Sequence, residues 1–168
     1  AILQALMMAG IKLSIEENKI ISGTPAGNRG NAFHFNATDC PDLFPPLVAL
    51  AAFCTGTSVI EGVHRLTHKE SNRALTLQEE FLKMGVEIRI QDDLMLVTGV
   101  SVIKGATVQS HHDHRIAMAC AVAALKAEEK TPSRSTAAVR RDLLNSFASG
   151  TVSASWSFMN IGGAIVLE

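Results

Sequence analysis

Charged residues gather in three short clusters, and each cluster stands immediately before a predicted helix. The clusters are residues 39–42, residues 68–73 and residues 111–115. A helix N-terminus presents unpaired N–H groups and the positive end of the helix dipole, so it attracts anions. If the fold brings these three helix starts together, the sequence predicts an anion-binding site.

The residue types in these clusters suit both anion binding and proton transfer. Arg73 and Arg115 could each bind a carboxylate or phosphate bidentately, whereas Lys69 offers a point charge. Asp42 and Glu70 would be carboxylates held among cations, as general acid–base catalysis requires. A structural role is the alternative, because Asp42 is also a good N-cap, and Glu70 with Arg73 is also an ordinary i,i+3 surface pair. Spacing alone leaves both readings open.

The third cluster, His-His-Asp-His-Arg, could also be read as a metal site. Three imidazoles and a carboxylate could ligate zinc, but neither the His-x-x-x-His spacing nor a Cys-x-x-Cys companion occurs. We therefore expect no metal here, and we interpret His114 and Arg115 as substrate contacts.

The elements that must position these clusters are predicted to occur twice. Residues 2–11 align with residues 77–86 at an offset of 75, and each segment predicts a helix that ends at a glycine. A period-2 hairpin, a strand, a buried helix and another strand are predicted to follow. The buried helices are expected at about 43–53 and about 114–126, because these segments are apolar nearly all round. The fold class is thus α/β (mixed α+β), with a repeated unit.

Composition excludes several other classes of protein. Lys and Arg number 15 against 16 Asp and Glu, and aromatic residues are only 5% of the chain, so nucleic acid is not an expected partner. The longest uncharged apolar run, Ile116–Leu125, is half of the roughly 20 residues that cross a membrane. Three cysteines without a pairing motif favour a reduced, cytoplasmic protein in which they are small core residues.

The first repeat has no counterpart of residues 69–73 before its helix. We therefore expect the chain to be a fragment of a longer protein. An exposed apolar face is expected where a further unit would pack.

Three motifs carry a resemblance to a known family. Pro41-Asp42 before Leu-Phe-Pro-Pro, the stretch 65–73 with Lys-Glu-Ser-Asn-Arg, and the stretch 112–118 with Asp-His-Arg-Ile-Ala-Met closely resemble the 5-enolpyruvylshikimate-3-phosphate synthase (3-phosphoshikimate 1-carboxyvinyltransferase) family. The resemblance covers about residues 1–130 and implies most of the C-terminal of two domains. It also implies an inside-out α/β barrel domain, built from βαβαββ units, that closes with its partner domain on the substrates.

The resemblance implies an enzyme of the shikimate pathway that transfers the enolpyruvyl group of phosphoenolpyruvate to the 5-hydroxyl of shikimate 3-phosphate and releases phosphate. No cofactor and no metal are implied. Asp42 would take up the hydroxyl proton, and Glu70 would move a proton to and from the enolpyruvyl methylene. The residues implied to bind substrate are Asp42 and Lys69 on the shikimate side, Arg73 and Arg115 at phosphoenolpyruvate, and His114 beside them.

Two departures from the family pattern lead to further expectations. In the family, the residues that bind the phosphate of shikimate 3-phosphate come mostly from the N-terminal domain, so this chain alone is expected to be inactive. Residues 131–168 lack the lysine and the Lys-Ser-Tyr-Pro type of segment that the family continues with, and residues after about 132 are expected not to be native; a divergent terminus is the alternative.

Two other functions stay open. The enolpyruvyl transferase that acts on UDP-N-acetylglucosamine shares the implied fold, but its reactive-cysteine loop is not recognisable here. A catalytically inert repeat domain that binds anions or a partner chain is the alternative from a different class.

Overall fold

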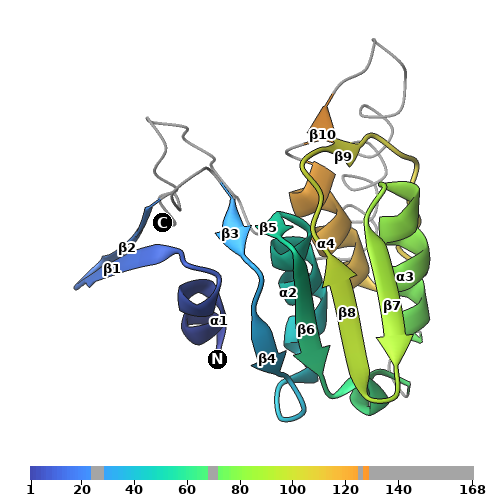
Figure 1. The fold of residues 1–168 in the computed structure, drawn as a ribbon, viewed down its shortest axis with the longest axis horizontal. Helices are drawn as coiled ribbons and strands as arrows, with labels where there is room; N and C mark the ends of the chain where they lie inside the picture. The colour runs from blue at the N-terminus through green and yellow to red at the C-terminus, as the bar shows by residue number, and fades with distance from the viewer. Residues whose placement is uncertain (24–28, 68–71, 125–126, 129–168) are drawn as a thin grey trace.

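A four-stranded sheet with helices on one face forms the centre of the protein (Figure 1). The computed structural model describes residues 1–23, 29–67, 72–124 and 127–128. The strand order is β4 (His34–Asn36), β6 (Thr57–Glu61), β8 (Leu94–Thr98) and β7 (Glu87–Gln91). Strand β4 runs parallel to β6, and the other neighbouring pairs are antiparallel.

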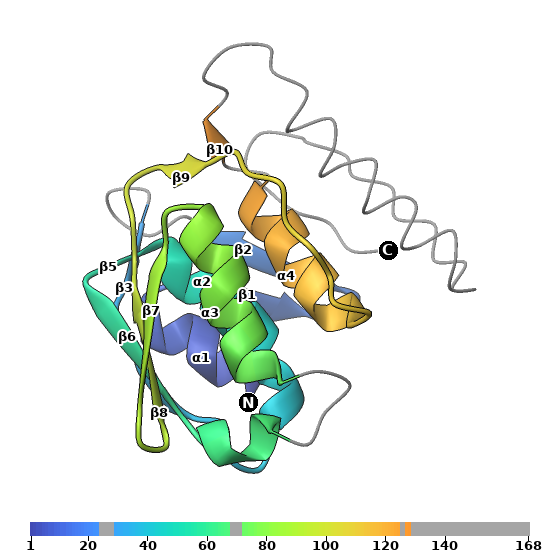
Figure 2. The ribbon, with the colours of Figure 1, turned by 90° about the vertical axis from the view of Figure 1, so that its right-hand side faces the viewer.

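Three helices lie on one side of this sheet, two of them in contact with its strands and the third packed against those two. They are α2 (Phe44–Ala52), α3 (Arg73–Lys83) and α4 (His114–Ala124), and Figure 2 shows all three on the same side. Along the strands, Ile60, Met95 and Val97 are buried beneath the helices, whereas Glu87 and Arg89 are exposed. This alternation is typical of a sheet with one face packed against the core and the other exposed to solvent.

Residues 30–98 contain one complete βαβαββ unit. Strand β3 (Gly30–Asn31) pairs in parallel with β5 (Cys54–Thr55), and this ladder continues into β4 and β6, with α2 as the crossover. Asn31 pairs with Thr55 and His34 pairs with Val59, so the second strand has one residue more than the first between these two pairs. The extra residue is accommodated as a bulge at Gly56, whose φ is +84°.

A half unit lies on each side of the complete one, and the predicted repeat is confirmed. The elements are α1 (Ile2–Met8), β1 (Lys12–Glu16) and β2 (Lys19–Gly23) before it, and β9 (Ile103–Lys104), α4 and β10 (Ala127–Glu128) after it. The hairpins β1–β2 and β7–β8 correspond at the predicted offset, since 87 − 12 and 94 − 19 both give 75. Strand β9 pairs in parallel with β10, just as β3 pairs with β5.

The prediction of two buried helices is confirmed for α2 and is wrong in part for α4. Helix α2 is buried nearly throughout. In α4, Ile116 and Cys120 are buried, but Met118 and Val122 are 45% and 52% exposed. The reason is that α2 and α3 cover only one side of α4 in the part of the chain that the structure describes.

The cysteines lie where small core residues are expected. Cys54 and Cys120 are buried and Cys40 is half-buried, and all three are free thiols. Burial raises the pKa of the Cys54 thiol to about 11 and that of Cys120 to about 12. Both buried thiols are therefore protonated and unreactive at neutral pH.

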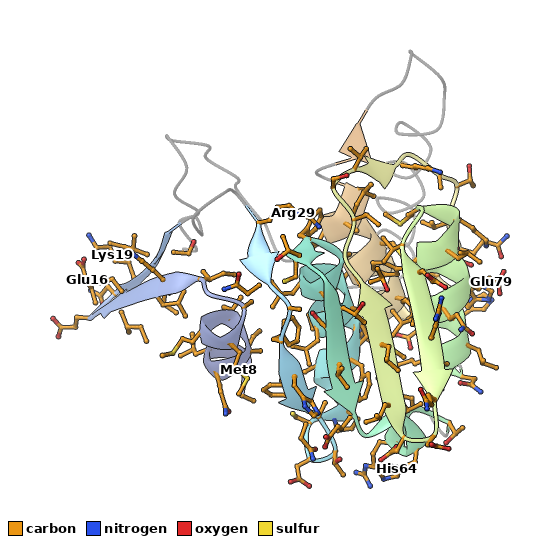
Figure 3. All side chains as sticks on the ribbon, viewed as in Figure 1. Met8, Glu16, Lys19, Arg29, His64 and Glu79 are labelled. Atoms are coloured by element: carbon orange, nitrogen blue, oxygen red, sulfur yellow. The ribbon has the colours of Figure 1, made fainter. Side chains whose placement is uncertain are left out.

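The first hairpin projects away from the rest of the described chain, with Glu16 and Lys19 at its tip (Figure 3). Apolar side chains on it and on α1 are exposed, while the expected packing of a further unit on them stays a prediction; they are Ile2, Met7, Met8, Ile15, Ile20 and Ile21. Among the described helices, none has the length and the apolar character needed to cross a membrane.

Candidate functional site

The N-terminal ends of three helical elements meet at the candidate site. Asp42 lies in a 3₁₀ turn, η1 (Pro41–Leu43), that leads directly into α2. Arg73 is the first residue of α3, and Asp113 is the residue before α4. The predicted convergence of helix starts is therefore present for η1–α2, α3 and α4.

Arg73 is the centre of the site. Its side chain is fully buried, its Nε donates to Oδ2 of Asp113 at 2.5 Å, and its Nη1 donates to Oδ1 of Asp42 at 2.8 Å. A guanidinium taken out of water requires carboxylates of this kind, because an unpaired buried charge is very costly. Its orientation is thus held by two carboxylates from two other elements.

Arg115 completes a ring of four residues. Its Nη2 lies 3.2 Å from Oδ2 of Asp42, and its backbone N–H donates to Oδ1 of Asp113 at 3.0 Å. Asp113 therefore binds Arg73 with one oxygen and caps the first turn of α4 with the other. We call Asp42, Arg73, Asp113 and Arg115 the Asp–Arg cluster.

The cap alternative for Asp42 is wrong, whereas the alternative pair of Arg73 with Glu70 lies outside the described residues. The N-cap of α2 is Leu43, so Asp42 is not the cap residue of that helix. Arg73 is not a surface residue, because its side chain is buried.

The other predicted site residues are not part of the Asp–Arg cluster. His114 is exposed in the first turn of α4, and its side chain makes no hydrogen bond or ion pair to any residue that the structure describes. Lys69 and Glu70 lie outside the described residues. The roles of all six predicted site residues remain predictions.

Asp113 was not singled out from the sequence as a site residue. It stands between two histidines, where a metal ligand, a helix cap and a substrate contact are all reasonable readings. The signal that distinguishes it is its place directly before a helix, where an aspartate is a preferred cap. Its bond to Arg73, 40 residues away, is a tertiary contact that spacing does not show.

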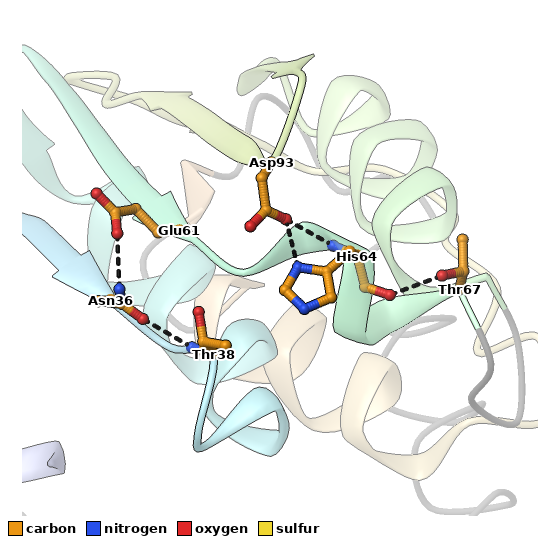
Figure 4. A network of polar contacts seen from close by, with 6 residues as sticks. All are labelled: Asn36, Thr38, Glu61, His64, Thr67 and Asp93. Atoms are coloured by element: carbon orange, nitrogen blue, oxygen red, sulfur yellow. Dashed lines mark hydrogen bonds and ion pairs between the residues drawn. The ribbon is translucent and has the colours of Figure 1, made fainter.

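A second polar network holds the segment that precedes residue 68 (Figure 4). A 3₁₀ turn, η2 (Val63–Leu66), begins at the tip of the β7–β8 hairpin, where Oδ1 of Asp93 accepts from the backbone N and the Nδ1 of His64, each at 2.8 Å. The backbone N–H and then the ring of His64 lower the pKa of Asp93. Nearby, Glu61 accepts from Asn36 at 2.7 Å. These contacts hold residues 63–67, the last described residues before Lys69.

The Asp–Arg cluster can bind an anion and accept a proton. It holds two guanidiniums and two carboxylates, so the arginines are oriented before any ligand arrives. The side chain of Asp42 is about half exposed, at 47%, and is the carboxylate of the cluster that a hydroxyl group can reach.

One group of possible metal ligands occurs among the described residues, and it lies outside the cluster. Ligand atoms of Glu79, Glu80 and His111 are within 4.8 Å of one another. The ammonium of Lys83 is 3.2 Å from Glu79 and 2.7 Å from Glu80, so both carboxylates already form ion pairs with a lysine of the protein.

Comparisons with known proteins agree on one family. The family model described as EPSP synthase (3-phosphoshikimate 1-carboxyvinyltransferase) matches residues 1–144, which extends past the boundary expected near residue 130. A 3-phosphoshikimate 1-carboxyvinyltransferase of Brachyspira hyodysenteriae is 38% identical over 122 residues, covering 73% of this chain and 29% of the relative. One of Clostridium acetobutylicum is 44% identical over 94 residues, covering 56% and 22%.

A solved structure supports the same assignment. An EPSP synthase from Acinetobacter baumannii aligns with a TM-score of 0.63 at 26% identity, over 76% of this chain and 32% of that one. The chain thus spans about 29% of the length of the Brachyspira relative that it matches. On the match to residues 1–144, and with the repeat and fold in agreement, the chain belongs to the EPSP synthase (3-phosphoshikimate 1-carboxyvinyltransferase) family.

Proposed function

We propose that this chain is part of an enzyme that transfers the enolpyruvyl group of phosphoenolpyruvate to the 5-hydroxyl of shikimate 3-phosphate. The hydroxyl oxygen attacks C2 of phosphoenolpyruvate while C3 gains a proton, which gives a tetrahedral intermediate. Loss of phosphate from C2 and of a proton from C3 then restores the enol ether. The products are the enolpyruvyl ether and inorganic phosphate.

The observation that carries this proposal is the Asp–Arg cluster at three helical starts. Phosphoenolpyruvate presents a carboxylate and a phosphate, and two pre-oriented guanidiniums suit such a ligand. Arg73 and Arg115 are proposed to bind it, with His114 beside them.

The proton transfers are assigned to two carboxylates. Asp42 is within reach of both arginines and is proposed to accept the proton of the 5-hydroxyl. Glu70 is proposed to give a proton to C3 and to take it back. Lys69 is proposed to contact the shikimate side and to add the positive charge that a balanced Asp–Arg cluster lacks.

The rest of the enzyme is proposed to come from polypeptide that this chain does not include. The chain spans about 29% of the Brachyspira relative, and a second domain is proposed to grip the shikimate phosphate and to exclude water on closing. This chain alone is therefore expected to bind phosphoenolpyruvate weakly and not to turn over. We place the activity in the cytoplasm, consistent with three free thiols.

Calorimetric titration of the 168-residue chain with phosphoenolpyruvate tests the proposal. Arg115→Ala is the cleanest variant, because this side chain is partly exposed and its loss leaves the core intact. It should weaken binding about 10- to 100-fold, as the loss of charged hydrogen bonds does. Arg89→Ala removes an exposed arginine on β7, and it should leave the affinity unchanged.

The outcomes separate the candidate functions. Binding that Arg115→Ala weakens and Arg89→Ala preserves supports the transferase. No binding by the wild-type chain, at concentrations where it is folded, favours an inert repeat domain instead. Release of phosphate from both substrates by this chain alone would contradict the need for a second domain.

A further inference from the structure

Glu80 carries a fully buried carboxylate on α3 that contacts a segment far along the chain. Its Oε2 accepts the backbone N–H of Gln109 at 2.8 Å, and its Oε1 accepts Nε2 of His111 at 2.9 Å. The third donor is Lys83, one turn along the same helix, at 2.7 Å. Two of the three bonds therefore tie α3 to residues 109–111.

The carboxylate is ionised although it is buried. Burial alone raises the pKa of Glu80, but hydrogen bonds from Lys83, Gln109 and His111 outweigh this effect and lower the pKa below its ordinary value. An ionised acceptor makes stronger hydrogen bonds than a neutral one. The tie between α3 and residues 109–111 is thus made of charge-assisted bonds.

The segment that Glu80 contacts has an unfavourable backbone conformation. Residues 105–113 contain no helix or strand, and His111 and His112 have φ values of +50° and +60°. This left-handed region is unfavourable for residues other than glycine and persists where the surroundings enforce it. Glu80 supplies such enforcement, since its contacts fall at His111 itself and two residues before it.

The left-handed turn leads directly into the candidate site. Asp113 follows His112, receives Nε of Arg73, and accepts the backbone N–H of Arg115. Arg73 and Glu80 are both on α3, so this one helix contacts residues 109–111 through Glu80 and Asp113 through Arg73. A shift of the turn would move Asp113 relative to Arg73.

We infer that Glu80 and His111 are positioning residues: their contact holds the 111–112 turn so that Asp113 orients Arg73, and this sets the affinity for phosphoenolpyruvate. Neither side chain is placed on the ligand. The inference rests on the proposed function for its ligand, but its structural part concerns only the Glu80–His111 contact and the Arg73–Asp113 bond.

Three variants of the 168-residue chain test the inference. Glu80→Gln keeps the shape but removes the charge, and His111→Ala removes the other partner from a half-buried position. Glu79→Gln is the matched control, because Glu79 is the neighbouring carboxylate, contacts the same Lys83, and lies on the outer side of α3 (Figure 3).

The first readout is the NMR signal of the Arg73 Nε–H, assigned by its disappearance in Arg73→Lys. Glu80→Gln and His111→Ala should shift this signal and speed its exchange with water, and Glu79→Gln should not. A loss of global stability alone would lower the unfolding midpoint but leave the signal of the folded molecules in place. An unmoved signal in both Glu80→Gln and His111→Ala would overturn the inference.

The second readout is the affinity for phosphoenolpyruvate. We expect the dissociation constant to rise about tenfold in Glu80→Gln and His111→Ala, the scale of one charged hydrogen bond, and less than about twofold in Glu79→Gln. A moved Arg73 signal with unchanged affinity would overturn the claim about the ligand. If the wild-type chain does not bind phosphoenolpyruvate, the proposed function fails, and the Arg73 signal still decides whether Glu80 positions the turn.

Discussion

The segments α1–β1–β2 and α3–β7–β8 follow the same plan with different surroundings. Each is a helix that ends at a left-handed glycine, with φ of +76° at Gly10 and +83° at Gly85, followed by a hairpin in the same register. At corresponding positions, Ile20 in β2 is 45% exposed and Met95 in β8 is fully buried. The two hairpins therefore share a local structure and differ in burial.

The difference comes from the neighbours of each hairpin. Strand β8 pairs with β6 on its second edge and packs against α2, whereas β2 pairs only with β1 among the described residues. Alternating residues and a polar turn are thus sufficient to specify a hairpin, while its burial depends on strands and helices from elsewhere. Paired substitutions at corresponding positions test this distinction.

The largest contrast is expected at the pair Met95 and Ile20. Met95→Ala opens a cavity beneath the helices and should lower the free energy of unfolding by about 2–5 kcal/mol. Ile20→Ala should lower it by less than about 1 kcal/mol, because the side chain is already half in water. Chemical denaturation followed by circular dichroism measures both. Equal losses would show that the two hairpins are equally buried in solution.

A smaller contrast is expected at the two hairpin turns. Asp93→Ala removes the bonds to the backbone and ring of His64 and should cost up to about 1 kcal/mol, as the loss of a helix cap does. Asn18 holds the corresponding place in the first turn and makes no side-chain hydrogen bond to a described residue, so Asn18→Ala should be neutral.

The effect of Asp93 should also depend on pH. Its folded-state pKa is lowered, so its stabilising effect is fully present above the ordinary value of 3.8 and is lost as the pH falls through the folded-state pKa. The difference in unfolding free energy between wild type and Asp93→Ala should therefore stay constant from neutral pH to about that value and shrink below it. A difference that does not change on acidification would contradict the role given to the carboxylate.

The smallest effects are expected where both copies are exposed. Leu82 and Met7 correspond, with exposures of 61% and 66%. Replacing either residue by glutamine should change the unfolding free energy by less than about 0.5 kcal/mol, the usual range for surface positions. A marked loss in Met7→Gln alone would mean that another surface covers α1 in solution.

Local patterns predicted most of the elements. The 3,4,3 spacing of Ala74, Leu77, Phe81 and Met84 is typical of the buried face of a helix, and all four side chains are buried in α3. Both hairpins and both helix-ending glycines also follow from sequence, because turn chemistry and period are local properties. The solvent-exposed side of α4 did not follow, since a helix that is apolar all round has no polar face to mark it.

The site could be predicted in part. Asp42, Arg73 and Arg115 stand before or at predicted helix starts, and the fold brings them together. Glu80 was missed because a glutamate in an amphipathic helix is usually exposed. Its spacing carried a signal, since it lies three residues after Leu77 and four before Met84, on the buried face. The partners on residues 109–113 depend on tertiary structure and could not be read from spacing.

All four strands of the central sheet come from the continuous stretch 34–98. Contacts between residues close in sequence form early in folding, because closing a short loop costs less entropy. The bond from Arg73 to Asp113 spans 40 residues and needs a segment that follows the sheet. Pulsed hydrogen exchange should therefore show protected β6 and β8 amides before the amide of Gln109 is protected. During synthesis, a nascent chain would carry a finished sheet while its Asp–Arg cluster is still unassembled.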